Sequence, residues 1–136
     1  MRLWHIDLIP YLPKSQLLAQ WRELNSIFKK QDKHILINYI YDYKKYELRH
    51  YSLEVIAEMR LRSYKVNIEN YLNYFKDLEF DLEFDYRPRF KEHNIEYLTI
   101  CYYNLREKYL RGQKDFTKEV WYKLDEFYKK EMLKDE

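Results

Sequence analysis

The stretch from Leu12 to Phe28, LPKSQLLAQWRELNSIF, decides the fold expected for this chain. Pro13 suits the first position of a helix, because its fixed φ is already helical and its missing N–H has no helical partner to lose. The apolar residues that follow recur at the spacing of one helix face: Leu17, Trp21, Leu24 and Phe28. We therefore predict an amphipathic helix over residues 14–28.

Glu23 lies off the apolar face of this helix. On a helical wheel that starts at Leu17, the apolar stripe centres near roughly 20° and Glu23 falls at about 240°. Arg22 falls at about 140°, on the opposite flank, so the two adjacent charges do not form a same-face ion pair. Each of them is free to take another partner.

The composition favours helices throughout one compact domain. The chain has 136 residues, 46% of them hydrophobic and 35% charged, which fits a single domain over residues 1–136. It holds one Gly and three Pro, so few positions suit the tight turns of β-hairpins. Its 16 Tyr could fill a core, stack on nucleobases, or both.

The remainder of the chain completes an all-α prediction of about three main helices with irregular connectors. Residues 1–12 are interrupted by Pro10 and predict an extended but packed N-terminal arm. Residues 34–43 have a strand-like composition but no hairpin turns, which favours a short buried helix or a connector. Further helical segments are predicted over 44–64, 67–76, 93–111 and a short 118–133.

Inward faces can be named for two of these helices, and one segment has a different period. The second main helix should bury Leu48, Tyr51 or Ser52, Val55 and Met59. The third should bury Ile95, Leu98, Cys101 or Tyr102, and Leu105, with Gly112 as its C-terminal cap. The segment DLEFDLEFDYRPRF, residues 77–90, alternates acidic and apolar residues, which predicts an extended segment, with a helix as the alternative.

Charge is unevenly distributed along the chain. The formal net charge is only +2, but residues 29–65 hold nine Lys and Arg against five Asp and Glu. Residues 77–85 instead place an acidic residue at every second position, which would repel a phosphate backbone. We therefore expect a local basic surface.

The lone Cys101 excludes an internal disulfide, and no leader or membrane segment is evident, so we expect a cytoplasmic monomer without an obligate protein partner.

The first helix resembles that of the phage-type pyrimidine-dimer DNA glycosylases, which also cleave abasic sites. The resemblance is one of register: Leu and Ala are followed by an aromatic residue and then Arg-Glu-Leu. Lys33-His34 falls where that family has a Lys-His pair, and YELRHYSLEVIAEMRLRSYKV (46–66) is similar to the family's second helix. Weaker similarity continues in NLREK (104–108) and in Trp121-Tyr122-Lys123.

The resemblance implies a chemistry and a set of site residues. In that family the α-amino group of the chain attacks C1′ of the damaged nucleotide, expels the base and forms an imine, and β-elimination then nicks the strand. A terminal amine suits this role, because with a pKa of about 7.7 to 8 roughly a tenth of it is unprotonated at neutral pH. The catalytic residues implied are Glu23 and the N-terminal residue, Met1 or Arg2. The residues implied to bind damaged double-stranded DNA are Arg22, Gln16, Lys33, His34, Lys108, Trp121 and Tyr122.

Three positions depart from the family pattern. The family has Thr as its second residue, exposed once Met is removed, whereas this chain has Arg2, beside which Met1 is expected to stay. A retained residue displaces the amine by up to about 3.8 Å. Gln16 and Ser26 stand where the family has His and Arg, so attack on abasic sites is better supported than recognition of dimers.

Two other classes of function stay open beside the enzyme. The first is a DNA-binding relative that has lost the amine nucleophile, and the second is a helical interaction module unrelated to nucleic acids. We predict no metal and no cofactor, because His5, His50 and His93 are too scattered along the sequence to indicate a metal site.

Overall fold

The computed structural model describes residues 1–79 and 87–134, and within them the regular structure consists of helices alone. The all-α prediction is confirmed. The elements are η1 (Ile6–Tyr11), α1 (Lys14–Lys30), η2 (Asn38–Asp42), α2 (Tyr46–Leu61), α3 (Glu69–Tyr74), α4 (Ile95–Leu110) and α5 (Lys118–Lys134), where η denotes a 3₁₀ helix. The helix predicted as short over 118–133 is α5, which spans 17 residues and is as long as α1.

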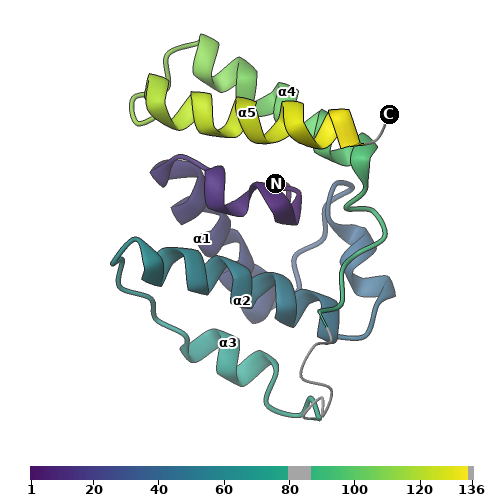
Figure 1. Cartoon of the computed structure of the whole chain (residues 1–136). Helices are drawn as coiled ribbons and strands as arrows, with labels where there is room; N and C mark the ends of the chain where they lie inside the picture. The colour runs from purple at the N-terminus through teal and green to yellow at the C-terminus, as the bar shows by residue number, and fades with distance from the viewer. Residues whose placement is uncertain (80–86, 135–136) are drawn as a thin grey trace.

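The helices surround the N-terminal segment (Figure 1). α4 and α5 lie side by side on one side of it, and α1 and α2 pack together on the other, with α3 against α1. η1 contacts both α2 and α5. This arrangement places the start of the chain in the middle of the fold.

The predicted apolar faces form the core. The four residues of the α1 stripe are buried, and so are Leu48, Tyr51, Ser52, Val55 and Met59 of α2. In α4, Leu98, Cys101, Tyr102 and Leu105 are buried, whereas Ile95 is only partly so. Gly112 follows α4 with a φ of 82°, a left-handed conformation that favours glycine, so its predicted role as a cap is confirmed.

The N-terminal arm is packed as predicted, but it is not extended throughout. Residues 6–11 form the 3₁₀ helix η1, which the His5 side chain caps by accepting the Asp7 N–H at 3.1 Å. A segment covered on two sides must satisfy its own backbone hydrogen bonds, and a helical turn does so locally. Pro10 is tolerated inside this short turn, and Pro13 precedes the start of α1.

The connectors agree with their predictions in part. Residues 38–42 form the short helix η2, although only Ile37 and Ile40 are buried in this region. The helical prediction for 67–76 corresponds to the six residues of α3. Most of the segment predicted as extended, 80–86, lies outside the described residues.

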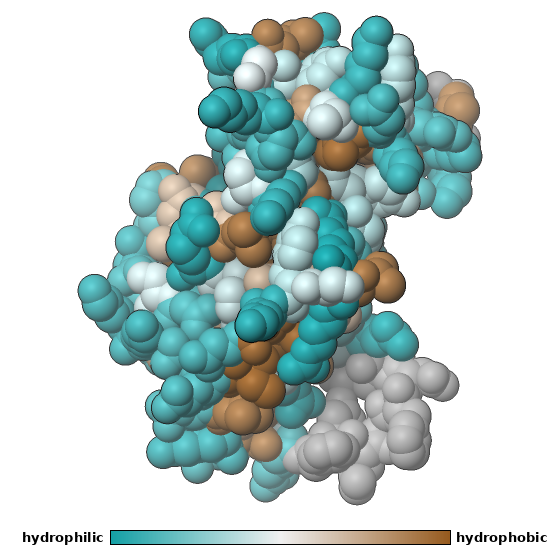
Figure 2. All heavy atoms as spheres, turned by 90° about the vertical axis from the view of Figure 1, so that its left-hand side faces the viewer, coloured by the Kyte–Doolittle hydropathy of each residue, from teal (hydrophilic) through white to brown (hydrophobic). Residues whose placement is uncertain are grey.

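The exterior of the protein is mainly hydrophilic on the face seen in Figure 2. Hydrophilic side chains cover most of the face drawn in Figure 2, and hydrophobic ones appear there in separate patches. In the described part of the chain, no helix is long and apolar enough to cross a lipid bilayer.

Candidate active site at the N-terminus

A cavity of about 240 Å³ lies where the N-terminus meets α1 and α4. It brings together five of the residues singled out in the sequence: Met1, Arg2, Gln16, Glu23 and Lys108. The other lining residues are Trp4, Ala19, Gln20, Leu36 and Asn104. The cavity thus holds the terminal amine and a carboxylate within one small space, with a lysine beside them.

Glu23 is half-buried in this cavity, and opposing influences act on its acidity. Burial raises the pKa of its carboxyl above the usual value. The positive N-terminal amine, a hydrogen bond from the main chain of Arg2 and a hydrogen bond from Gln20 each act to lower the same pKa. The amine is therefore close enough to Glu23 for their charges to interact.

Gln20 connects the N-terminal segment to Glu23. Its side chain is 1% exposed, and each of its four hydrogen-bonding positions faces a polar partner. The amide Oε1 accepts the Trp4 N–H at 2.8 Å and lies 2.9 Å from the Tyr51 hydroxyl, whose single proton is directed at either this oxygen or the Trp4 carbonyl. The amide Nε2 donates to the Arg2 carbonyl at 3.1 Å and to Glu23 Oε2 at 3.0 Å.

The chemistry of these partners fixes the orientation of the Gln20 amide. A main-chain N–H can only donate and a main-chain carbonyl can only accept, so the amide cannot be flipped without losing both bonds. Nε2 must then face Glu23 and favour its ionised form. Gln20 therefore holds the first residues of the chain and the carboxylate in one fixed arrangement.

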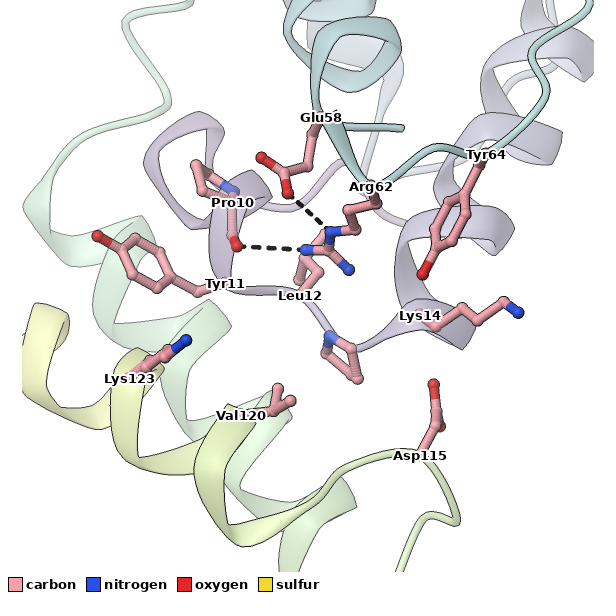
Figure 3. Close-up of a pocket in the computed structure, with 11 residues that line it drawn as sticks. Pro10, Tyr11, Leu12, Lys14, Glu58, Arg62, Tyr64, Asp115, Val120 and Lys123 are labelled. Atoms are coloured by element: carbon pink, nitrogen blue, oxygen red, sulfur yellow. Dashed lines mark hydrogen bonds and ion pairs between the residues drawn. The ribbon is translucent and has the colours of Figure 1, made fainter. Parts of the chain in front are cut away.

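Further contacts hold the N-terminal segment on its other sides. The Tyr51 hydroxyl donates to the Trp4 carbonyl at 2.7 Å, and the Tyr97 hydroxyl donates to the Leu3 carbonyl. At the far end of η1, Arg62 Nη2 donates to the Pro10 carbonyl at 3.2 Å while its Nε pairs with Glu58 at 2.7 Å (Figure 3). The N-terminal segment is thus anchored at both ends.

The hollow shown in Figure 3 is separate from the Glu23 cavity. It lies between η1, the end of α2 and the start of α5, and its volume is about 380 Å³. None of the site residues predicted from the sequence lines it. Its best-buried charges, Arg62 and Glu58, are paired with one another, which indicates a role in anchoring the segment.

The side chain of Arg2 is directed toward aromatic residues. Its guanidinium lies 5.9 Å from the Trp4 ring centre and 5.7 Å from that of Tyr97, in cation–π contact with both. The Glu23 carboxylate interacts with the main chain of Arg2. The substitution of Arg at position 2 is therefore accommodated without placing a guanidinium on the carboxylate.

The other predicted DNA-binding residues lie outside the cavity. Arg22 is exposed on α1 next to Glu23, and Lys33 and His34 are exposed in the loop between α1 and η2. Tyr122 is 60% exposed on α5. Trp121 is 9% exposed and packs against Tyr109, Phe116 and Tyr102, so little of its ring is available to stack on a base.

The histidines have structural partners. His5 and His93, distant in sequence, stack with ring centres 5.5 Å apart, and both are buried. His93 Nδ1 accepts the Ile6 N–H at 3.1 Å, and its Nε2 lies 2.7 Å from the Tyr39 hydroxyl. Among residues 1–79 and 87–134, no group of three or more His, Cys, Asp or Glu side chains could hold a metal ion.

Reasoning from the sequence missed Gln20 and Leu36. A signal for Gln20 was present, because on the helical wheel it falls at about 300°, between the apolar stripe and Glu23. A polar side chain at the edge of a buried face must find hydrogen-bond partners. No comparable pattern marks Leu36, because its position in the cavity depends on the course of a loop.

One of three comparisons with known proteins identified a family. The model of the family described as pyrimidine dimer DNA glycosylase matches residues 1–72, which include the N-terminal segment, α1 and α2. No curated protein and no solved structure matched the chain. Lys108, Trp121 and Tyr122 lie beyond the matched region. The match covers more than half of the 136 residues, and the chain belongs to the pyrimidine dimer DNA glycosylase family.

Proposed function

We propose that this protein is a DNA glycosylase with abasic-site lyase activity that uses its N-terminal α-amine as nucleophile and Glu23 as the catalytic carboxylate. One observation carries the proposal: the Met1 amine and the Glu23 carboxylate line the same cavity, and the charge of the amine acts on the pKa of Glu23. Pyrimidine dimers and abasic sites in duplex DNA are the proposed substrates.

The proposed reaction needs only groups that the chain supplies. The unprotonated amine forms a bond to C1′ as the bond from C1′ to the base breaks, and the bond from C1′ to the ring oxygen then breaks, with proton transfer to that oxygen, to give an imine. At an abasic site the amine instead condenses with the open aldehyde, and water is lost. Removal of a proton from C2′ then expels the 3′-phosphate, and hydrolysis of the imine releases the enzyme. Glu23 would stabilise the iminium charge and transfer these protons.

The charge around the cavity suits a phosphate backbone. Lys108 and the terminal amine lie in the cavity. Arg22 is exposed and adjacent in sequence to Glu23, and Lys33 is exposed three residues before Leu36. Such contacts bind any sequence, and they favour a kinked duplex by neutralising its phosphates. We propose them as the DNA-backbone contacts.

The nucleophile is the amine of whichever residue begins the mature chain. With Met1 present, its amine and the main chain of Arg2 both act to lower the pKa of Glu23. Were Met1 removed, the Arg2 nitrogen would become the terminal amine. We propose Met1, because a large second residue disfavours its removal.

Borohydride trapping tests this proposal. Reduction should link the protein covalently to a duplex with one abasic site, and peptide mass analysis should place the adduct on the first residue. Glu23→Gln should bind the same duplex with unchanged affinity but nick it at least about 100-fold more slowly. Failure to trap an adduct, together with salt-sensitive DNA binding, would instead support a non-catalytic DNA-binding relative.

A further inference from the structure

The loop between α1 and η2 presents two large apolar side chains beside the Glu23 cavity. Ile35 is 85% exposed, the highest value among the large hydrophobic residues described, and Leu36 is 40% exposed. Leu36 also lines the cavity together with Met1 and Glu23. A single exposed aliphatic residue is ordinary, but two in succession at the rim of a candidate site indicate a binding surface.

This loop is held in a defined conformation. The His34 N–H donates to Asn38 Oδ1 at 2.7 Å, and the Leu36 N–H donates to His34 Nδ1 at 3.2 Å. The N–H groups of Ile37 and Asn38 both donate to the His34 carbonyl, at 2.8 and 2.9 Å. Ile37 is fully buried and anchors the turn in the core. Ile35 and Leu36 are thus presented to solvent by a fixed turn, which lowers the entropic cost of inserting them elsewhere.

The surroundings of the loop favour DNA as the occupant. Lys33 precedes the turn and is exposed, and Lys108 and the terminal amine lie in the adjoining cavity. A duplex whose phosphates contact these cations would bring its bases to the loop. The reaction also needs a sugar that is reachable only when its base is absent or turned out of the stack.

We propose that Ile35, supported by Leu36, is an apolar wedge that enters the base stack at the lesion and fills the space of the missing or extruded base. Proteins that kink DNA insert isoleucine and leucine between bases in this way. Of the two aromatic residues that the sequence favoured as DNA contacts, Trp121 is covered by core side chains, and Tyr122 is exposed on α5 but does not line the Glu23 cavity. The proposed wedge depends on one part of the proposed function, namely that damaged DNA binds at the Glu23 cavity, and it does not depend on the chemistry.

The test uses a duplex with a tetrahydrofuran abasic analogue and 2-aminopurine in the opposite strand. The analogue has no C1′ leaving group, so the experiment measures binding and unstacking without chemistry. Wild-type protein should bind this duplex in preference to the intact one and increase the 2-aminopurine fluorescence. Ile35→Ser should reduce that preference about ten-fold and abolish most of the fluorescence increase, because the variant has no aliphatic side chain at this position to transfer from water into the base stack. Its thermal unfolding should be unchanged, since Ile35 is exposed.

Leu61→Ser is the matched control. Leu61 is 79% exposed at the end of α2 and does not line the Glu23 cavity. Its substitution should leave both the preference and the fluorescence at wild-type values. Equal losses in the two variants, or no loss in Ile35→Ser, would overturn the wedge.

The wedge and the catalytic proposal can fail separately. A trapped adduct with natural abasic DNA, combined with an Ile35-independent preference for the analogue, would reject the wedge and keep the enzyme. An Ile35-dependent preference without any trapped adduct would keep the wedge in a protein that only binds DNA. Absence of binding to either duplex would reject both.

Discussion

Replacement of Gln20 by Met would remove the amide that joins the N-terminal segment to Glu23 and keep nearly the same side-chain volume. Three hydrogen bonds of the amide are lost, and the Trp4 N–H, which Gln20 accepts at 2.8 Å in the buried interior, is left without this partner. A buried donor without a partner costs about 1–3 kcal/mol, and the other lost bonds add smaller amounts, so we expect the free energy of unfolding to fall by about 2–4 kcal/mol.

The same substitution should affect catalysis in two ways. A displaced terminus should slow nicking of abasic DNA by about 100-fold, since misplacement of reacting groups by about 1 Å has effects of this size. The Gln20 hydrogen bond lowers the pKa of Glu23, so its loss should raise that pKa further. The acidic limb of the rate profile should therefore move to higher pH.

Urea unfolding and single-turnover nicking at saturating enzyme, from pH 5 to 9, measure these effects. Ser52→Ala is a suitable control, because Ser52 is equally buried but its hydroxyl donates to the Leu48 carbonyl within α2 at 2.8 Å. This control should lose stability without moving the acidic limb. If Gln20→Met is destabilised yet keeps the wild-type rate and pH profile, Gln20 has no positioning role and the reasoning fails.

Three further outcomes are expected. Burial lowers the pKa of His93 from its usual 6.5 to about 3, so between these values the unfolded chain binds a proton that the folded chain does not, and stability falls as the pH drops through 6.5. At pH 4.5 this amounts to about 3 kcal/mol relative to pH 7.5, and urea unfolding of His93→Gln should show a pH-dependent loss of stability that is smaller by this amount. Lys108→Ala should weaken binding of intact and abasic DNA alike and reduce the slope of log K against log salt by about 1; a loss confined to abasic DNA would contradict a backbone contact. A chain cleaved to begin at Arg2 should still be trapped on abasic DNA, through its new terminal amine, whereas one extra Gly before Met1 should slow trapping by about 100-fold; equal rates in the extended and native chains would exclude the terminal amine.

The long helices were predictable because their information is local. The stripes of α1 and α2 repeat at helical spacing, and every member named in advance is buried. The arm was harder, since its 3₁₀ turn depends on packing between α2 and α5, elements far away in sequence. The secondary-structure propensity of a segment does not reveal that distant helices will bury it.

Part of the candidate site could likewise be predicted from the sequence, and part of it depends on the fold. The helical wheel placed Glu23 off the apolar face of α1, and the resemblance singled out Glu23, the terminal amine and Lys108, which the fold brings to one cavity. The roles of Gln20 and Leu36 depend on which segment crosses α1 and on the path of a loop. A helical wheel can mark Gln20 as a polar residue at the edge of the core, but only the fold reveals its partners.

The way Gln20 holds the terminus also explains how Arg can occupy position 2. Gln20 contacts the carbonyl of Arg2 and the N–H of Trp4, which are main-chain atoms and are the same for any side chain at position 2. The Arg2 side chain lies over Trp4 and Tyr97, where its charge is held by aromatic faces. The residue at position 2 can therefore vary without loss of the Gln20 hydrogen bonds to the main chain. In the proposed reaction, residue 2 would act on the chemistry by deciding whether Met1 stays, and hence which nitrogen is the nucleophile.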